Sequence, residues 1–184
     1  CKSCEVACKQ EHGLGSGVYR NRVLWLTGEA EAAPTPASTP APALDFLNVT
    51  CQHCERPACL RACPVNPKAL SKDPVTGVVT VNEDRCTGCG ECVVACPYGA
   101  IGYDPIDHHA VKCDLCSDRR AEGLGPACAS VCPGKAIQFG KRDILVSQAA
   151  DSGRSAGEHD PFLMGPGTVY LEPLKEGSEF SLAA

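Results

Sequence analysis

The sequence lacks the features that mark several large classes of protein. No run of apolar residues approaches the roughly 18 to 20 needed to cross a bilayer, so we expect no membrane span within it. The net charge is -5 over 184 residues, which offers no basic surface to nucleic acid. A nucleophile triad, a phosphate-binding glycine loop and an HExxH metal helix are all missing from the sequence. The chain therefore carries no motif for bond-breaking catalysis.

Cysteine is the residue in excess, at 15 of 184 positions. In a short secreted protein that fraction would indicate a disulfide framework. Here the count is odd, and the cysteines fall into four tight groups instead of being dispersed, which disfavours disulfides. The groups, numbered one to four along the chain, are Cys1, Cys4 and Cys8; Cys51, Cys54, Cys59 and Cys63; Cys86, Cys89, Cys92 and Cys96; and Cys113, Cys116, Cys128 and Cys132.

The spacing within the groups predicts iron-sulfur clusters. Group three reads CTGCGECVVACP. This is the C-x2-C-x2-C-x3-C-P run of bacterial ferredoxins, in which the first three thiolates hold one cubane and the fourth binds a neighbouring cluster. Groups two and four keep this pattern and vary only the spacer before the third cysteine.

The residues between the cysteines suit this geometry. Gly88 and Gly90 allow the loop of group three to approach a cluster closely. A helical turn after the third cysteine carries the fourth, at an offset of four, toward a different cluster. Pro97 then ends that helix, because proline cannot continue it.

A zinc site is the alternative interpretation, because C-x2-C pairs also build tetrahedral zinc centres. Zinc ribbons usually separate two such pairs by a longer spacer, whereas in group three a third cysteine follows closely after the pair. The spacing therefore favours iron and sulfide, with a structural zinc module as the distant alternative.

The number of thiolates predicts how many clusters the protein holds. Four cubanes need about 16 thiolates, and the chain supplies 15. Group one, CKSCEVAC, matches the last three positions of the ferredoxin run. We therefore expect the chain to be N-terminally truncated and the intact protein to carry a cysteine three residues before Cys1, where the first ligand of that group would stand.

The four groups together resemble a known family. With CQHCERPAC in the second group and KCDLC, a long spacer and PACASVCP in the fourth, roughly residues 1 to 140 resemble the electron-transfer (beta) subunit of molybdopterin oxidoreductases. That family includes iron-sulfur subunits of dimethyl sulfoxide, polysulfide and tetrathionate reductases and of membrane-associated formate dehydrogenases. Some members replace a group-three cysteine by tryptophan, whereas here all four are present.

The resemblance implies a fold and a domain organisation. The fold would be α+β, with two pseudo-symmetric ferredoxin-like modules, each holding two 4Fe-4S clusters, and loop-rich insertions. Groups one and four would build one module from residues 1–28 and 103–146, and groups two and three the other from residues 44–102. Residues 29–43 would form a Pro/Ala-rich linker, and residues 147–184 a C-terminal extension.

The resemblance also implies how the clusters share ligands. Group one would pair with group four and group two with group three, each lending its last cysteine to the partner's cluster. The implied sets are Cys51, Cys54, Cys59 and Cys96; Cys86, Cys89, Cys92 and Cys63; Cys113, Cys116, Cys128 and Cys8; and Cys1, Cys4 and Cys132 with the upstream cysteine.

Strand patterns flank group three and are partly repeated. GVVTVNEDRC (77–86) alternates like a short strand with Val79 and Val81 on one face, and GAIGYD (99–104) is typical of the returning strand. After group four, VCPGKAIQFG (131–140) echoes ACPYGAIGYD (95–104), which indicates an internal repeat.

Two segments lie outside the cysteine groups. The proline- and alanine-rich stretch 29–43 predicts an extended, mobile surface insertion. In the tail, PFLMGPGTVYLEPL (161–174) offers a short apolar patch. We favour a tail that packs back on its own modules. The sharper hypothesis is docking on a partner subunit through Phe162, Leu163, Met164 and Tyr170.

A few other residues are conspicuous. His53 lies inside group two, where four cysteines already serve, so a hydrogen-bonding role is favoured over iron ligation. Trp25 is interpreted as a packing residue. Two sets are interpreted as surface: the turn histidines His108 and His109, and the basic residues Lys112, Arg119 and Arg120, which flank group four and could raise a cluster's potential.

The function follows from the cofactor and the resemblance. Cubanes with four thiolate ligands pass single electrons and leave no open coordination site. The resemblance implies a non-catalytic subunit that relays electrons between a molybdopterin catalytic subunit and a quinone-linked membrane anchor. A polyferredoxin or a hydrogenase-linked electron-transfer subunit is the alternative.

Overall fold

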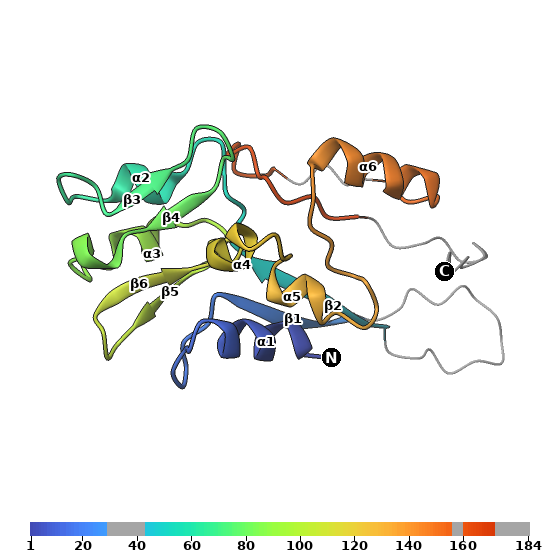
Figure 1. Ribbon diagram of the computed structural model, residues 1–184, viewed down its shortest axis with the longest axis horizontal. Helices are drawn as coiled ribbons and strands as arrows, with labels where there is room; N and C mark the ends of the chain where they lie inside the picture. Colours follow the sequence, from blue (N-terminus) through green and yellow to red (C-terminus); the bar gives the residue numbers. More distant parts are fainter. Residues whose placement is uncertain (29–42, 156–159, 172–184) are drawn as a thin grey trace.

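The computed structural model describes residues 1–28, 43–155 and 160–171. The expected mobile insertion 29–43 therefore lies, except for Ala43, outside the described residues. Within them the fold is α+β, built from short helices and two-stranded antiparallel sheets (Figure 1). The helices are α1 Ser3–Glu11, α2 Ala58–Ala62, α3 Glu91–Ala95, α4 Ser117–Ala121, α5 Ala127–Ser130 and α6 Arg142–Asp151, with a 3-10 turn η1 at Glu83–Arg85. The strands are β1 Asn21–Gly28, β2 Ala43–Thr50, β3 Leu70–Lys72, β4 Val79–Val81, β5 Ile101–Asp104 and β6 His109–Lys112.

Short helices carry the third cysteine of groups two, three and four, as the spacing predicts. Cys59 lies in α2 and Cys92 in α3, and in both cases the fourth cysteine is the residue that ends the helix. Cys63 and Cys96 have extended backbones because a proline follows each of them, and the residue before proline disfavours the helical region. The predicted helical turn and its proline stop are confirmed.

Strand pairing corrects one sequence-based prediction. Strands form at β4 and β5 as expected, but β5 does not return alongside β4. Strand β4 pairs with β3, and β5 pairs with β6. Both hairpins close through an aspartate that accepts backbone N–H bonds within its own turn: Asp73 from Val75 and Thr76, and Asp104 from Ile106 and Asp107. Pairing β3 with β4 and β5 with β6 through these short turns costs less loop-closure entropy than pairing β4 with β5 across group three would.

The sequence echo after group four does not extend to a strand. Residues 131–140 contain turns and bends where the equivalent residues after group three form β5. Strand β5 has β6 directly after it as a partner, whereas 131–140 leads straight into α6. A strand without a partner leaves its backbone groups unpaired, so the repeated sequence does not produce a repeated strand here.

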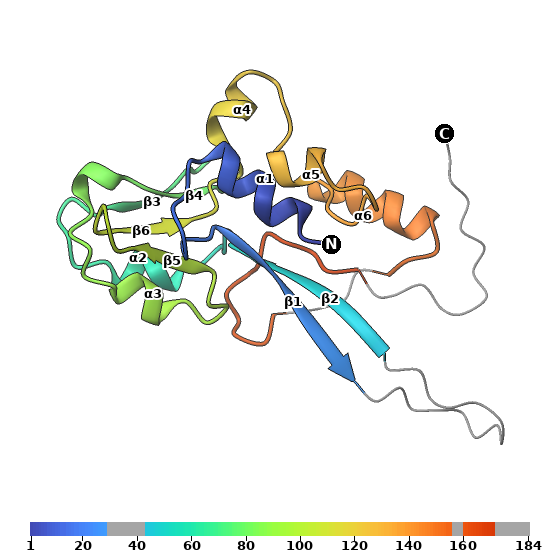
Figure 2. The ribbon, with the colours of Figure 1, turned by 90° about the horizontal axis from the view of Figure 1, so that it is seen from below.

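Helices from different cysteine groups lie against one another in two pairs. Helix α1 packs on α5, which brings group one to group four, and α2 packs on α3, which brings group two to group three. Figures 1 and 2 show both pairs side by side from two directions. Segments far apart in sequence thus meet through their cysteine-bearing helices.

The β1–β2 hairpin extends away from the helices (Figure 2). Trp25 lies opposite Phe46 in its register, and their rings meet edge to face with centroids 5.7 Å apart. Trp25 is a packing residue in this sense, yet 61% of it stays exposed, as does 51% of Phe46. The hairpin thus pairs a strand that follows group one with a strand that precedes group two.

The hydrophobic core is small and rich in cysteine. Its buried members are Val79, which is 1% exposed, four other aliphatic side chains and three thiols: Ala69, Leu70, Ile101, Ala110, Cys59, Cys63 and Cys92. Strands β3 to β6 and helices α2 and α3 all contribute to it. The core is therefore centred on the cysteine groups and not on a separate apolar layer.

The tail packs back on group two. The backbone N–H groups of Glu55 and Gly167 bond to Gly165 and Gln52 respectively, at 2.7 and 2.6 Å. Tyr170 accepts a bond from Gln52, and Phe162 meets Tyr98 edge to face at 5.3 Å. Leu163, in contrast, is 72% exposed. The packing agrees with the favoured expectation, while docking on a partner stays a hypothesis.

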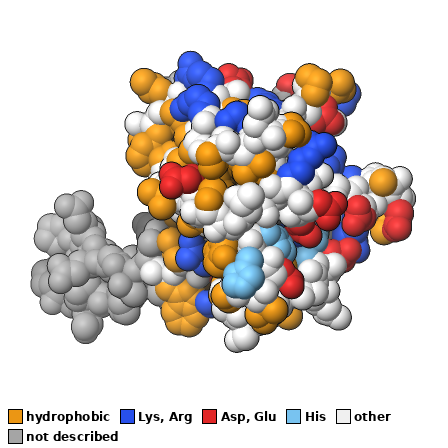
Figure 3. Space-filling model, turned by 90° about the vertical axis from the view of Figure 1, so that its left-hand side faces the viewer, with side chains coloured by type: hydrophobic (Ala, Val, Ile, Leu, Met, Phe, Trp, Pro, Cys, Tyr) orange, Lys and Arg blue, Asp and Glu red, His pale blue; other side chains and the backbone are white. Residues whose placement is uncertain are grey.

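The surface shows no dominant sign of charge on the face seen in Figure 3. Hydrophobic, basic and acidic side chains are interspersed across it, and histidines lie beside acidic groups. Among the described residues, no helix combines the length and apolarity needed for a membrane span.

Candidate iron-sulfur centres

Groups one and four meet at the α1–α5 contact. Cys8 is buried, and burial followed by repulsion from three neighbouring thiols raises its pKa to about 12; these are Cys113, Cys116 and Cys128. Burial, followed by repulsion from Cys113 and Cys116, raises the pKa of Cys128 to about 11. Cys8, the last cysteine of group one, therefore lies among the first three cysteines of group four.

Groups two and three meet at the α2–α3 contact. Burial, and then Cys51 and Cys96, raise the pKa of Cys54. The pKa of Cys59 is raised by burial and also by Cys96. Cys96, the last cysteine of group three, thus lies among the first three cysteines of group two.

The reciprocal exchange places Cys63 near group three. Cys63 packs in the core cluster with Cys92, and Cys86 packs against that cluster. Burial opposes ionisation of Cys63, but the backbone N–H groups of Val65, Ala69 and Leu70 hold its pKa below the usual value. Burial, followed by Cys86, raises the pKa of Cys92 to about 11.

The fourth expected set is only partly brought together. Cys4 is buried, and its pKa is raised mainly by burial, with a contribution from Cys132. Cys1 is exposed near the start of α1. Cys4 and Cys132 therefore lie near one another across the α1–α5 contact.

Several thiols accept hydrogen bonds from N–H donors. The backbone N–H of Leu115 points to Cys113 Sγ at 3.4 Å, and that of Ala110 points to Cys86 Sγ at 3.5 Å. The side-chain amide of Asn48 donates to Cys4 Sγ at 3.5 Å. Such donors favour the thiolate over the thiol and are typical of cysteines that ligate iron-sulfur clusters.

The loop of group three depends on two glycines. Gly88 and Gly90 have φ of +69° and +79°, which side chains rarely tolerate. A Cβ at Gly88 would also overlap the carbonyl oxygen of His108, whereas one at Gly90 would meet open space. The close backbone approach at Gly88 is to the β5–β6 turn, while the expected approach of this loop to a cluster stays a prediction.

The cysteines fit an iron-sulfur cofactor chemically. All 15 are free of disulfides. Their thiolates are crowded, so each raises the pKa of its neighbours, as at Cys8 and Cys92. Crowded thiolates become stable when they bind a positively charged centre, because the metal replaces their protons. The donor set is therefore suited to a metal cluster and poorly suited to isolated thiols.

His53 is a hydrogen-bonding residue, as expected. Its Nδ1 accepts the backbone N–H of Val79 at 3.0 Å, which links group two to strand β4. Burial, followed by the charge of Lys112, lowers its pKa to about 3. The imidazole is thus neutral, with Nε2 carrying its proton.

The other conspicuous residues divide between surface and interior. His108 lies in the β5–β6 turn, as expected, and meets Tyr103. The surface-turn expectation is wrong for His109, which begins strand β6 and faces Glu83 at 3.5 Å with 14% of its side chain exposed. Arg119 pairs with Glu11 at the surface. The expectation that Lys112 belongs to solvated surface is wrong. It is 3% exposed, because its ammonium finds backbone carbonyl acceptors inside the protein.

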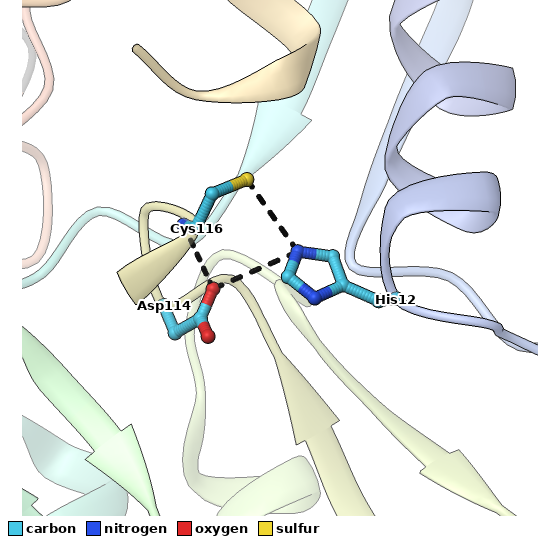
Figure 4. A group of neighbouring side chains, drawn as sticks. All are labelled: His12, Asp114 and Cys116. Carbon is cyan, nitrogen blue, oxygen red and sulfur yellow. Dashed lines mark hydrogen bonds and ion pairs between the residues drawn. The ribbon is translucent and has the colours of Figure 1, made fainter. Parts of the chain in front are cut away.

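Sequence reasoning missed a polar network beside group four. His12, Asp114 and Cys116 converge there (Figure 4), and Arg20 pairs with Asp114 at 3.1 Å. A sequence signal existed, because His12 follows Cys8 by four positions and residues at that spacing share a helix face. No comparable signal marks Arg20, which comes from the loop before β1.

Comparison with known proteins agrees with this geometry. The family described as 4Fe-4S dicluster domain matches residues 42–142. The B subunit of anaerobic dimethyl sulfoxide reductase from Escherichia coli (strain K12) is 38% identical over 151 residues, which cover 82% of this sequence and 72% of that protein. The thiosulfate reductase electron transfer subunit of Salmonella typhi is 38% identical over 144 residues, covering 78% and 70%. The B subunit of polysulfide reductase from Wolinella succinogenes is 38% identical over 143 residues, covering 76% and 69%.

The family match spans cysteine groups two to four, and the match to the Escherichia coli B subunit covers 82% of the sequence. A 4Fe-4S protein of this kind carries single electrons, which agrees with the crowded, hydrogen-bonded thiols. This protein belongs to the 4Fe-4S dicluster family of iron-sulfur electron-transfer subunits that includes the B subunits of dimethyl sulfoxide, thiosulfate and polysulfide reductases.

Proposed function

We propose that the intact protein holds four 4Fe-4S clusters whose fourth ligands are exchanged between paired groups. The position of Cys8 among the thiols of group four carries this proposal most directly, and Cys96 beside Cys54 and Cys59 supports the second exchange. The proposed sets are Cys51, Cys54, Cys59 and Cys96; Cys86, Cys89, Cys92 and Cys63; Cys113, Cys116, Cys128 and Cys8; and Cys1, Cys4 and Cys132 with a cysteine three residues upstream.

The same pairing underlies the proposed modules. Residues 1–28 and 103–146 form one ferredoxin-like module, and residues 44–102 form the other. The contacts of α1 with α5 and of α2 with α3 support a pseudo-symmetric arrangement, because each joins the two cysteine groups of one module. Residues 147–184 are an extension that adds contacts to group two through Gly165 and Gly167.

The protein relays electrons within a larger enzyme. Bound cubanes supply one-electron redox chemistry. The buried apolar residues packed around the cysteines would shield bound clusters from water, and N–H donors such as that of Leu115 would stabilise the thiolates that hold them. The similar proteins are named as subunits of reductases. We therefore place this protein between a molybdopterin catalytic subunit and a quinone-linked membrane subunit.

Metal analysis tests the cofactor assignment. The protein is purified anaerobically with its native upstream residues, and iron and acid-labile sulfide are measured per polypeptide. About 16 iron atoms agree with four cubanes. A cysteine-free upstream segment with about 12 iron atoms limits the protein to three complete clusters. Stoichiometric zinc without sulfide overturns the electron-transfer assignment.

Substitution of the exchanged ligands tests the pairing. In Cys8→Ser, the electron paramagnetic resonance (EPR) signal lost or altered is expected to be the one lost in Cys128→Ser. In Cys96→Ser it is expected to match that of Cys59→Ser. If Cys8→Ser instead reproduces the loss seen in Cys4→Ser, the ligands are not exchanged between groups one and four.

Purification under native conditions tests the partners. A tag on this protein is expected to capture a molybdopterin protein and a membrane protein in equal amounts. Capture of a hydrogenase, or recovery of the tagged protein by itself with all its clusters, supports the alternative of a hydrogenase-linked subunit or a polyferredoxin.

A further inference from the structure

A histidine, an aspartate and a cysteine from two distant segments meet beside group four (Figure 4). His12 ends helix α1, while Asp114 and Cys116 lie in the loop that leads into α4. His12 Nε2 lies 3.5 Å from Cys116 Sγ and 3.7 Å from Asp114 Oδ1. The side chains of His12 and Asp114 are both mostly shielded from solvent.

The three groups do not form a metal site of their own. Asp114 already accepts the backbone N–H of Cys116 at 2.9 Å and the hydroxyl of Ser117 at 3.1 Å. Its second oxygen also pairs with the guanidinium of Arg20 at 3.1 Å. A carboxylate engaged by three donors, one of them a cation, has little capacity left for a metal ion.

The network instead orients the imidazole toward the thiol. Asp114 Oδ1 lies beyond hydrogen-bond range of Nε2, whereas Cys116 Sγ is within the longer range that sulfur allows. A thiolate can only accept, so the proton between the two groups must be on Nε2.

Asp114 and Arg20 also position the acceptor. The bond from the Cys116 backbone to Asp114 holds Cys116 in a left-handed conformation with φ of +50°. The guanidinium of Arg20, 3.1 Å from the other carboxylate oxygen, holds the Asp114 side chain in place. The carboxylate therefore anchors the loop that presents Cys116.

We propose that His12 is a positioning residue that donates a hydrogen bond from Nε2 to the Cys116 thiolate and thereby raises the reduction potential of the cluster at Cys113, Cys116, Cys128 and Cys8. This rests on the proposed function, because it assigns Cys116 to that cluster. A donor to a ligand sulfur stabilises the more negative, reduced state, so its removal lowers the potential. Within the described residues, the thiol that the His12 ring contacts is that of Cys116.

Two substitutions separate the hydrogen bond from packing. His12→Phe keeps a planar ring and removes the donor, while His12→Gln keeps an N–H at a similar reach from the backbone. His109→Phe is the matched control, because His109 faces Glu83 at 3.5 Å on a different element. All variants are studied in the intact complex, and reduction is followed by EPR-monitored redox titration.

The expected result is a lower potential for one cluster in His12→Phe. A tenfold change in its reduction equilibrium corresponds to about 59 mV for one electron. His12→Gln is expected to restore most of the shift, and His109→Phe to leave every cluster unchanged. The affected signal is identified as the one that Cys8→Ser removes or alters.

Two kinds of failure are distinguishable. If the complex contains all its iron and His12→Phe shifts no potential, the inference is wrong while the proposed ligand sets stand. If Cys8→Ser and Cys116→Ser leave every signal intact, the ligand assignment itself fails. Should His12→Phe lose the cluster altogether, His12→Gln decides: a wild-type potential supports the hydrogen bond, and loss of the cluster in that variant too overturns it.

Discussion

The ammonium group of Lys112 donates hydrogen bonds to the backbone carbonyl oxygens of Val79 and Cys113. One buried cation thereby joins strand β4 to the first cysteine of group four. The same charge favours the thiolate form of Cys51 and Cys59 against the effect of burial. Lys112 therefore lies at the boundary between the two proposed modules.

Lys112→Met is expected to lower the potential of the cluster assigned to Cys51 and Cys59. Loss of a nearby positive charge disfavours the more negative reduced state. A tenfold shift in the reduction equilibrium would be about 59 mV. The two carbonyl acceptors also lose their partner, at a cost of about 1–3 kcal/mol each in stability. EPR-monitored redox titration and iron content are the measurements.

The exposed Lys141 provides the matched control for this change. Lys141→Met removes the same charge from the surface, where water and salt screen it. Equal potentials in both variants would mean that the burial of Lys112 has no electrostatic consequence for the clusters.

Gly88→Ala is expected to disrupt group three. The new Cβ would overlap the carbonyl oxygen of His108, and the backbone there has φ of +69°. Backbone atoms cannot move aside as the end of a flexible side chain can, so the loop must shift away from the β5–β6 turn. We expect loss of the cluster assigned to Cys86, Cys89 and Cys92, measured as a fall of about four iron atoms per polypeptide.

Gly134→Ala should retain full iron content, because no atom lies within 4 Å of the added methyl group and φ is not positive. A Gly88→Ala protein with wild-type iron and wild-type EPR signals would contradict the role assigned to the close approach at His108.

Asp160→Asn is expected to loosen the tail from group two. Asp160 accepts the N–H groups of Met164 and Gly165 at 2.8 and 2.9 Å. Burial opposes its ionisation, but these bonds hold its pKa below the usual value. The stabilisation is therefore complete above the ordinary carboxyl pKa near 3.9 and is lost as pH falls through the lower folded value.

Hydrogen exchange at neutral pH measures the same loss without exposing the clusters to acid. The amides of Met164 and Gly165 are expected to exchange several-fold faster in Asp160→Asn, because a neutral amide replaces the charged acceptor. Asp151→Asn, at the exposed end of α6, is the control. Unchanged exchange in the tail would show that Asp160 does not hold it.

The Trp25–Phe46 pair is expected to stabilise the β1–β2 hairpin. Its edge-to-face geometry, with planes at 79°, predicts a coupling of about 0.5–1.5 kcal/mol. A two-stranded sheet is marginal alone, so this amount is a large part of its local stability. Hydrogen exchange of the hairpin amides in Trp25→Ala, Phe46→Ala and the double variant gives the coupling. Strictly additive effects would show that the rings do not interact.

Cysteine spacing was enough to predict the cofactor, the short helices and their proline stops. Each of these depends on residues within about a dozen positions, so local geometry constrains them. Strands at Val79–Val81 and Ile101–Asp104 were predicted for the same reason, from alternation within a few residues. Their partners were not, because pairing depends on which turn closes at the lower entropic cost.

The interior positions of Lys112, His12 and Arg20 depend on how distant segments pack. The sequence alone suggests a surface position for Lys112, yet it meets Val79, which is 33 positions earlier. His12 and Cys116 are separated by 104 positions and meet because group one packs against group four. Ligand chemistry is encoded in short spacings, whereas the charges and donors around each thiol come from contacts that form once the whole protein has folded.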